Sequence, residues 1–335
     1  MGIKNLLKFL NNNYPELIKT LEKPINNNFN KTKIAIDISI ILYQVIIAIR
    51  NSGTDMLNSQ GEVISHILGL FNKTIVLLKL NILPIYVFDG KPPEFKSKIL
   101  QTRRDIKYKA YSKLEEDLSE EEKIKYFKRT VSISKKQIEE CKELLTLLGI
   151  PFIEAPEEAD SQCAQLVKDG IASGVLTEDM DILTFGASTI YRNLTSYKKD
   201  PLQINLFDIL HKLDLTYEQF VELCILFGCD YCDKIKDLSP DTIYKYYYKN
   251  KNIEATLNML SKNNLITSAT SENYNLINFY QYKNYFINPP NIDCNNIKFN
   301  KCNIKELEKL LVDKYGLAKN KIQNKLYYLD KIIYL

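Results

Sequence analysis

The first 90 residues alternate between short apolar runs and longer amphipathic stretches. Residues 33–36 and 85–88 are mostly apolar runs of strand length, and an aspartate follows each of them. Between the two runs, residues 39–50 and 66–80 repeat apolar side chains at intervals of three and four, the spacing of an amphipathic helix. Apolar strands that alternate with helices predict a largely parallel sheet that is buried on both faces.

Residues 91–136 interrupt this alternation. The segment opens with Pro92-Pro93, is rich in charge and poor in large aliphatic side chains, and breaks between residues 117 and 122. Its first part, residues 91–113, holds eight lysines or arginines and two acids, whereas the whole chain has a net charge of +4. We expect two exposed helices that leave the α/β body as an arch, with a basic stripe suited to a phosphate backbone. A solvated helix face is the alternative that this pattern alone leaves open.

The alternation resumes after the charged segment. Further strands are expected at residues 151–154 and 174–176. Helices are expected at residues 135–148, 156–168, 216–227, 306–315 and 319–333. From about residue 250 the chain is rich in asparagine and its pattern is less regular. The prediction is therefore an α/β body followed by a C-terminal helical region.

The composition mainly excludes classes of protein and kinds of site. The 335 residues are 45% hydrophobic and 26% charged, which is typical of a soluble globular protein. The longest apolar run, residues 34–49, contains Asp37 and is too short and too polar to span a membrane. No secretory signal pattern opens the chain, and seven irregularly spaced cysteines indicate an intracellular, reducing compartment. Cys229 and Cys232 lack the further ligands that zinc needs, because the chain has only two histidines.

Acidic residues recur where the predicted strands and helices begin or end. Seven acids share this placement: Asp37, Asp89, Glu158, Asp160, Asp179, Asp181 and Asp230. Because ligands of parallel α/β sheets bind outside the carboxyl ends of the strands, all seven can face one cleft. They would repel one another unless cations neutralise them, and oxygen ligands without histidine suit Mg²⁺ or Mn²⁺. Two such ions about 4 Å apart are a device for phosphodiester hydrolysis. An aspartate after a strand can equally be the N-cap of the next helix, an alternative that stays open for Asp37 and Asp179.

Five segments carry a resemblance to a known family. They are residues 34–44 (IAIDISIILYQ), 86–97 (YVFDGKPPEFKS), 147–160 (LLGIPFIEAPEEAD), 176–186 (LTEDMDILTFG) and 223–232 (LCILFGCDYC). In content, order and spacing they resemble the flap endonuclease branch of the XPG-like nucleases. The resemblance implies an α/β fold with a PIN-like, mixed and largely parallel twisted sheet flanked by helices, a helical arch and a C-terminal helical region. It also implies a structure-specific 5′ flap endonuclease and 5′–3′ exonuclease that acts in DNA replication, repair or recombination.

By the same resemblance the chain divides into overlapping regions. They are an N-terminal nuclease region (1–106), an arch insertion (91–136), an internal nuclease region that completes the sheet and metal site (137–235), a degenerate helix–hairpin–helix region (216–250) and a C-terminal helical region (251–335). The turn at residues 235–240 lacks both glycines of the family's Gly-x-Gly hairpin. A weaker grip on duplex phosphates, and on the potassium ion that helps to hold them, is expected from this loss.

The resemblance also assigns roles to individual side chains. Two Mg²⁺ ions, for which Mn²⁺ can substitute, are expected in the site. The first would be held by Asp37, Asp89, Glu158 and Asp160, and the second by Asp160, Asp179, Asp181 and Asp230. The expected catalytic residues are Lys96, Arg103 and Asp181. Lys96 and Arg103 are seven residues apart and therefore on one helix face, so that both can contact the scissile phosphate.

Further residues match positions that contact DNA in the family. The expected contacts are Gly2, Tyr43, Arg50, Lys96, Arg103, Arg104, Lys245 and Lys249. The ring of Tyr43 would stack on the base next to the cut. Gly2 would lie near the active site, and Arg50 would contact the 3′ end of the substrate. The expected substrate is DNA with a 5′ flap or another junction between single strand and duplex.

Two positions depart from the family in ways that bear on activity and partners. Position 160 is Asp where cellular relatives usually carry Glu, and we expect activity to survive the loss of one methylene. Leu329 and Asp330 stand where a sliding-clamp box would carry its aromatic pair, so clamp binding by that route is not expected. The protein is expected to act as a monomer without a membrane partner, in the nucleus or at a cytoplasmic viral replication site.

Two other functions share parts of this pattern. XPG-like proteins that only bind nucleic acid typically lose several metal carboxylates, whereas all seven positions keep an acid here. Junction resolution or bubble incision would keep the enzyme and change its substrate, but relatives of that kind usually carry long insertions or tails. The pattern therefore favours a compact flap endonuclease.

Overall fold

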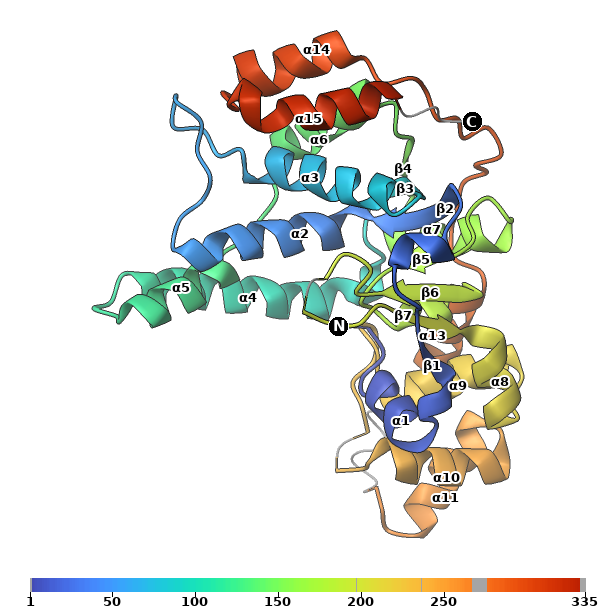
Figure 1. Ribbon diagram of the computed structural model, residues 1–335. Coiled ribbons are helices and arrows are strands. Elements are labelled where there is room, and N and C mark those ends of the chain that lie inside the picture. The colour runs from blue at the N-terminus through green and yellow to red at the C-terminus, as the bar shows by residue number, and fades with distance from the viewer. Residues whose placement is uncertain (1, 197, 236, 267–275, 332–335) are drawn as a thin grey trace.

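The computed structural model describes residues 2–196, 198–235, 237–266 and 276–331, and centres on one mixed sheet (Figure 1). Within this part of the chain seven strands pair in the order β1-β7-β6-β5-β2-β3-β4. Their bounds are Ile18–Thr20 (β1), Thr32–Asp37 (β2), Ile82–Phe88 (β3), Phe152–Glu154 (β4), Val175–Leu176 (β5), Thr189–Arg192 (β6) and Leu202–Asn205 (β7). The five strands from β6 to β4 pair in parallel, whereas β7 joins β6 and β1 antiparallel. The predicted fold class, a mixed and largely parallel sheet, is confirmed.

Helices cover both faces of the sheet (Figure 1). Their bounds are Leu6–Asn13 (α1), Ile38–Ile49 (α2), Ser65–Lys79 (α3), Ser97–Leu114 (α4), Glu120–Arg129 (α5), Lys135–Leu148 (α6), Ala159–Lys168 (α7), Leu206–Leu213 (α8), Tyr217–Phe227 (α9), Pro240–Asn250 (α10), Ile253–Lys262 (α11), Leu276–Ile287 (α13), Ile304–Lys309 (α14) and Lys319–Lys331 (α15). One hydrophobic core lies under α2, α3, α6, α14 and α15, and the other under α1, α7, α9, α10 and α13. Among the described helices, none is both long and apolar enough to cross a membrane.

The central strands supply side chains to both cores. In β2, Ile34 and Ile36 enter one core and Ala35 the other, because successive side chains of a strand point to opposite faces. All six residues of β2 pair with β3 in parallel, from Thr32 opposite Ile82 to Asp37 opposite Val87. Both strands therefore end at the same edge of the sheet, where the predicted acids follow them.

The charged segment forms the expected pair of exposed helices. Within α4 only Ala110 is buried, and no side chain of α5 is buried. The two helices pack along each other and project from the body as a hairpin (Figure 1). Ser119 begins α5 with a capping box to Glu122, and the break between the two helices, residues 115–119, overlaps the predicted interval of 117–122.

One predicted helix begins later than expected, and two helices form where the sequence pattern located none. The helix expected from residue 156 begins at Ala159, because the carbonyls of Pro156 and Glu157 accept the N–H groups of Lys91 and Gly90 and keep this stretch non-helical. The chain after residue 250, whose pattern is less regular, forms α11 and α13 within the predicted C-terminal helical region. In α11 the Asn252 side chain caps the helix by accepting the N–H of residue 255 at 2.9 Å.

The predicted helices near the C-terminus are confirmed with changed bounds. The pattern at residues 306–315 corresponds to α14 followed by a π-helical turn at Leu310–Lys314. The last predicted helix is described as α15 up to Lys331, and its final residues 332 and 333 lie outside the described part of the chain. Lys236, in the predicted hairpin turn, also lies outside it.

Candidate metal and nucleic-acid site

The ends of β2 and β3 bring two of the predicted acids together. Asp37 accepts the N–H of Ser39 at 2.7 Å, so it is the N-cap of α2 as well as the last residue of β2. The Ser39 hydroxyl donates to Asp89 at 2.8 Å, and Asp89 also accepts the N–H of Ala159 at 3.0 Å. Burial raises the pKa of Asp37 well above its usual range, and the charge of Asp89 raises it further. Asp37 is therefore an N-cap that also lies beside Asp89, and its expected role as a metal ligand stays a prediction.

The arch places two cations over the acidic edge. Lys96, directly before α4, donates from Nζ to Glu158 and lies 3.8 Å from Asp230. Arg103 donates from Nη2 to Asp230 at 2.7 Å. Burial lowers the pKa of Lys96, but Glu158 and other nearby carboxylates outweigh this effect and raise the pKa above its ordinary value. Both predicted cations thus face the predicted acids.

The remaining three acids form a tight carboxylate cluster. One oxygen from each of Asp160, Asp179 and Asp181 lies within 4.8 Å of the other two. Asp160 lies in the first turn of α7, whereas Asp179 and Asp181 follow β5 in a loop that Thr177 shapes by accepting the Asp179 N–H at 2.9 Å. Burial raises the pKa of Asp160 and of Asp181 well above the usual range, and the neighbouring carboxylates add to this effect.

This carboxylate cluster fits a hard divalent cation. Among the described buried side chains, one carboxylate oxygen of Asp160 and one of Asp181 have no hydrogen-bond partner. A buried anionic oxygen without a donor is costly unless a cation neutralises it. The donor set consists entirely of carboxylate oxygens, which are the ligands that Mg²⁺ and similar ions prefer. The seven predicted acids thus converge around one edge of the sheet, and at least this part of them can hold metal.

Gly2 lies directly against the carboxylate cluster. A Cβ built on Gly2 would lie 2.8 Å from Asp181 Oδ1 and 2.9 Å from Asp179 Oδ1, and the φ of Gly2 is +74°. Only glycine meets both conditions without strain, since it has no Cβ and tolerates positive φ. The structure therefore places Gly2 against the carboxylate cluster, and its expected contact with DNA stays a prediction.

The other predicted DNA contacts differ in their surroundings. Tyr43 exposes 42% of its surface on α2, and Arg104, Lys245 and Lys249 are also exposed. Arg50 differs, because its guanidinium makes two 2.9 Å bonds to Asp55 and a third to the carbonyl of Phe127 in the arch. Its side chain is only 13% exposed. In this structure the Arg50 side chain therefore links the end of α2 to the following loop and to α5 by hydrogen bonds.

Two residues that hydrogen-bond to the site acids are not predicted from the sequence. Ser39 bridges Asp37 and Asp89, and Tyr231 donates its hydroxyl to Glu158. Their positions, two residues after one acid and directly after Asp230, are the only signal that the sequence offers for them.

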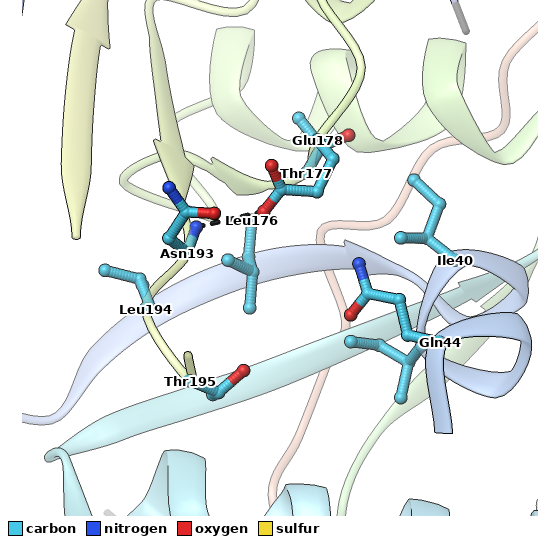
Figure 2. A pocket seen from close by; sticks show the side chains of 9 residues that line it. Ile40, Gln44, Leu176, Thr177, Glu178, Asn193, Leu194 and Thr195 are labelled. Atoms are coloured by element: carbon cyan, nitrogen blue, oxygen red, sulfur yellow. Dashed lines mark hydrogen bonds between the residues drawn. The ribbon is translucent and has the colours of Figure 1, made fainter. Parts of the chain in front are cut away.

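A small pocket lies beside the site, between α2 and the loops that follow β5 and β6 (Figure 2). Its volume of about 20 Å³ is room for about one water molecule. Figure 2 shows Glu178 turned toward Asn193, whose N–H it accepts at 3.0 Å, and Glu178 also pairs with Arg192 at 3.1 Å. Glu178 therefore holds the loop together and is separate from the carboxylate cluster.

Comparison with known proteins identifies the family. The model described as the XPG N-terminal domain matches residues 1–110, and the one described as the XPG I-region matches residues 149–230. Flap endonuclease 1 of Monosiga brevicollis is 38% identical over 330 residues, which cover 96% of this chain and 87% of that protein. Flap endonuclease 1 of Heterostelium pallidum is 39% identical over 343 residues, which cover 99% and 86%. The chain belongs to the flap endonuclease family.

Solved structures agree with this assignment. The flap endonuclease-1 structure from Methanococcus jannaschii is 30% identical, with a TM-score of 0.69 over 93% of this chain and 96% of that one. The catalytic core of Rad2 in complex with DNA substrate has a TM-score of 0.74 over 98% and 100% at 22% identity, which shows a shared fold. The two family-model segments together contain all seven acids, and the predicted flap endonuclease resemblance is confirmed. The chain is thus a member of a family of metal-dependent nucleases.

Proposed function

We propose that this flap endonuclease family member is a structure-specific 5′ flap endonuclease and 5′–3′ exonuclease that hydrolyses DNA at junctions between single strand and duplex. Its role is in DNA replication, repair or recombination. The convergence of seven acids at the carboxyl edge of the sheet, beneath the basic base of the arch, carries the proposal. The oxygens of Asp160 and Asp181 that have no hydrogen-bond partner support it most directly, because a bound cation would neutralise them.

Two Mg²⁺ ions, replaceable by Mn²⁺, would occupy the acidic site. Asp37, Asp89, Glu158 and Asp160 would hold or orient one ion, and Asp160, Asp179, Asp181 and Asp230 the other. When bound, the ions supply a polarised phosphodiester, an activated water and stabilisation of the leaving oxygen. The shorter side chain of Asp160 still offers its oxygens to the carboxylate cluster, which supports retained activity.

The side chains of the protein itself bind and orient the substrate. Lys96 stays protonated because its pKa is raised, so its ammonium and the Arg103 guanidinium can meet the charge that develops on the scissile phosphate. In the DNA-free protein the same two cations neutralise Glu158 and Asp230. The exposed ring of Tyr43 offers a stacking surface for the base beside the cut.

The residues expected to contact duplex and single-stranded DNA differ in how accessible their charged groups are. Arg104, Lys245 and Lys249 are exposed and can meet phosphates directly. A contact between Arg50 and the substrate would require its guanidinium to leave Asp55 and the Phe127 carbonyl.

We further propose that the protein acts as a monomer in a reducing compartment, in the nucleus or at a cytoplasmic viral replication site. All seven cysteines are free thiols, which suits such a compartment. Leu329, within the segment compared with a sliding-clamp box, is buried in a hydrophobic core and so has no exposed surface for a partner.

The deciding experiment is a cleavage assay on a labelled 5′-flap duplex with Mg²⁺, beside a single-stranded oligonucleotide. Asp181→Ala removes a carboxylate of the cluster, and Glu178→Gln is the matched control because Glu178 lies close in sequence but outside it. We expect wild type and Glu178→Gln to cut at the junction and Asp181→Ala to be inactive. Binding without cleavage in Mg²⁺ or Mn²⁺ would refute the enzyme and indicate a protein that only holds DNA.

A further inference from the structure

An aromatic cluster outside the metal site joins the start of the arch to the C-terminal region. The ring of Phe95 packs against the rings of Tyr231, Tyr282 and Tyr285, with centroids 4.9, 5.6 and 4.8 Å away. Tyr231 also packs against Tyr285 and Phe286, at 5.5 and 5.1 Å. Such edge-on and tilted ring pairs are favourable and restrict the rings to one arrangement. The cluster thus fixes the ring of Tyr231 between the arch and α13.

The hydroxyl of Tyr231 points out of this cluster to a site acid. It donates to Oε2 of Glu158, while Lys96 Nζ donates to Oε1 of the same carboxylate. Both oxygens of Glu158 therefore have a protein donor, in contrast to Asp160 and Asp181, each of which keeps one oxygen without a partner. Glu158 is 4% exposed, so no solvent competes for these bonds.

We propose that Tyr231 is a positioning residue: it holds the Glu158 carboxylate from one side, and Glu158 in turn fixes the Lys96 ammonium over the acidic site. Without the Tyr231 hydroxyl, Glu158 has one donor and its side chain can turn, which lets Lys96 move away from the position of the scissile phosphate. This inference rests on the proposed function, because Lys96 has a catalytic task only if the chain cleaves DNA. Phe95 and α13 contribute by keeping the Tyr231 ring in place.

A matched arrangement elsewhere in the chain provides the control. Glu222, which is not one of the seven site acids, accepts the Tyr247 hydroxyl at 2.8 Å on Oε2 and Lys283 Nζ at 2.8 Å on Oε1. Tyr247 is fully buried, as Tyr231 nearly is. Tyr247→Phe therefore removes the same kind of bond, at a similar cost in stability, without touching the metal site.

The test compares single-turnover cleavage of a 5′-flap duplex at saturating DNA and Mg²⁺. Tyr231→Phe should lower the rate roughly tenfold, since loss of a hydrogen bond to a charged group is of that order. Its dissociation constant for the flap, measured in Ca²⁺, should stay unchanged, and Tyr247→Phe should cleave like wild type. A Tyr231→Phe rate within about twofold of wild type would overturn the proposal, because a tenfold loss is what the missing bond should cause. A wild type that fails to cleave would instead refute the proposed function.

A second measurement separates positioning from a general structural role. In a Lys96→Ala background, Tyr231→Phe should lower the rate further by less than about twofold, because groups that act through one another are not additive. Fully additive effects would overturn the proposed route through Lys96. Phe95→Leu, which loosens the ring and leaves the hydroxyl, should also slow cleavage by several-fold, and an unchanged rate would overturn the role of the aromatic cluster.

Discussion

Replacement of Asp181 by Asn should make the metal-free protein more stable while it abolishes cleavage. The carboxylate cluster of Asp160, Asp179 and Asp181 brings three oxygens within 4.8 Å of one another. Two full charges at that distance repel by roughly 3 kcal/mol at an effective dielectric constant of about 20. Protonation relieves part of this repulsion, because burial and the neighbouring charges raise the pKa of Asp160 and Asp181. We therefore expect a net gain of about 1–2 kcal/mol from a substitution that conserves shape.

The measurement is thermal unfolding in EDTA at pH 8. For a chain of 335 residues the expected gain corresponds to a rise in Tm of roughly 2 °C. An acid whose folded pKa is raised destabilises the fold above that pKa, and the loss is relieved as pH falls through it. The advantage of Asp181→Asn should therefore shrink as the pH is lowered from 8 toward 5.

In Mg²⁺ the wild type should melt at a higher temperature than Asp181→Asn, the reverse of their order in EDTA. At a hundred times its dissociation constant an ion stabilises the wild type by about 2.7 kcal/mol, and the variant by much less, which exceeds the advantage of about 1–2 kcal/mol that the variant has in EDTA. Glu178→Gln is the control, since Glu178 is paired with Arg192 and its loss should bring no gain in EDTA. An Asp181→Asn protein that melts below wild type in EDTA would refute the picture of a cluster strained by its own charge.

Three further substitutions have defined outcomes. Gly2→Ala would place a Cβ 2.8 Å from Asp181 at positive φ, so the Mg²⁺ concentration for half-maximal rate should rise roughly fivefold, and an unchanged metal titration would contradict this. His66, at the start of α3, is buried, and its Nε2 lies 2.7 Å from Glu140 Oε2. Burial lowers the pKa of His66 below its ordinary 6.5, so its contribution to stability is complete above that pH and is lost as the pH falls toward the folded pKa. In His66→Gln the free energy of unfolding should therefore fall less steeply as the pH drops below 6.5. Denaturation curves at several pH values that show the same pH dependence as wild type would refute this prediction. Arg50→Ala should lower the free energy of unfolding by about 3 kcal/mol, because it leaves the largely buried Asp55 unpaired. A loss below about 1 kcal/mol in urea denaturation would show that the ion pair contributes little to stability.

Much of the fold follows from local pattern. The apolar runs of β2 and β3 and the aspartates after them predict parallel strands that end at one edge, because strand period and the rules of parallel sheets are local and general. The edge strand β1 and its neighbour β7 are three and four residues long, and nothing in such short stretches shows that they pair with each other across the chain. The positions of α11 and α13 are not predicted for a similar reason, since their apolar residues are buried against α9 and its neighbours.

The sequence by itself determined which acids could form the site, where the basic arch begins and which family the chain resembles, because residue identity and spacing carry these properties. Only the tertiary structure decided the partners of each charge: Lys96 with Glu158, Arg103 with Asp230, and Arg50 with Asp55. It also decided that Tyr231 reaches Glu158. Lys96, Arg103 and Tyr231 meet partners between 62 and 134 residues away in the chain, and such contacts depend on how distant elements pack, which no local pattern contains. Arg50 and Asp55 are five residues apart, yet the third bond of Arg50, to the arch, again requires the folded chain.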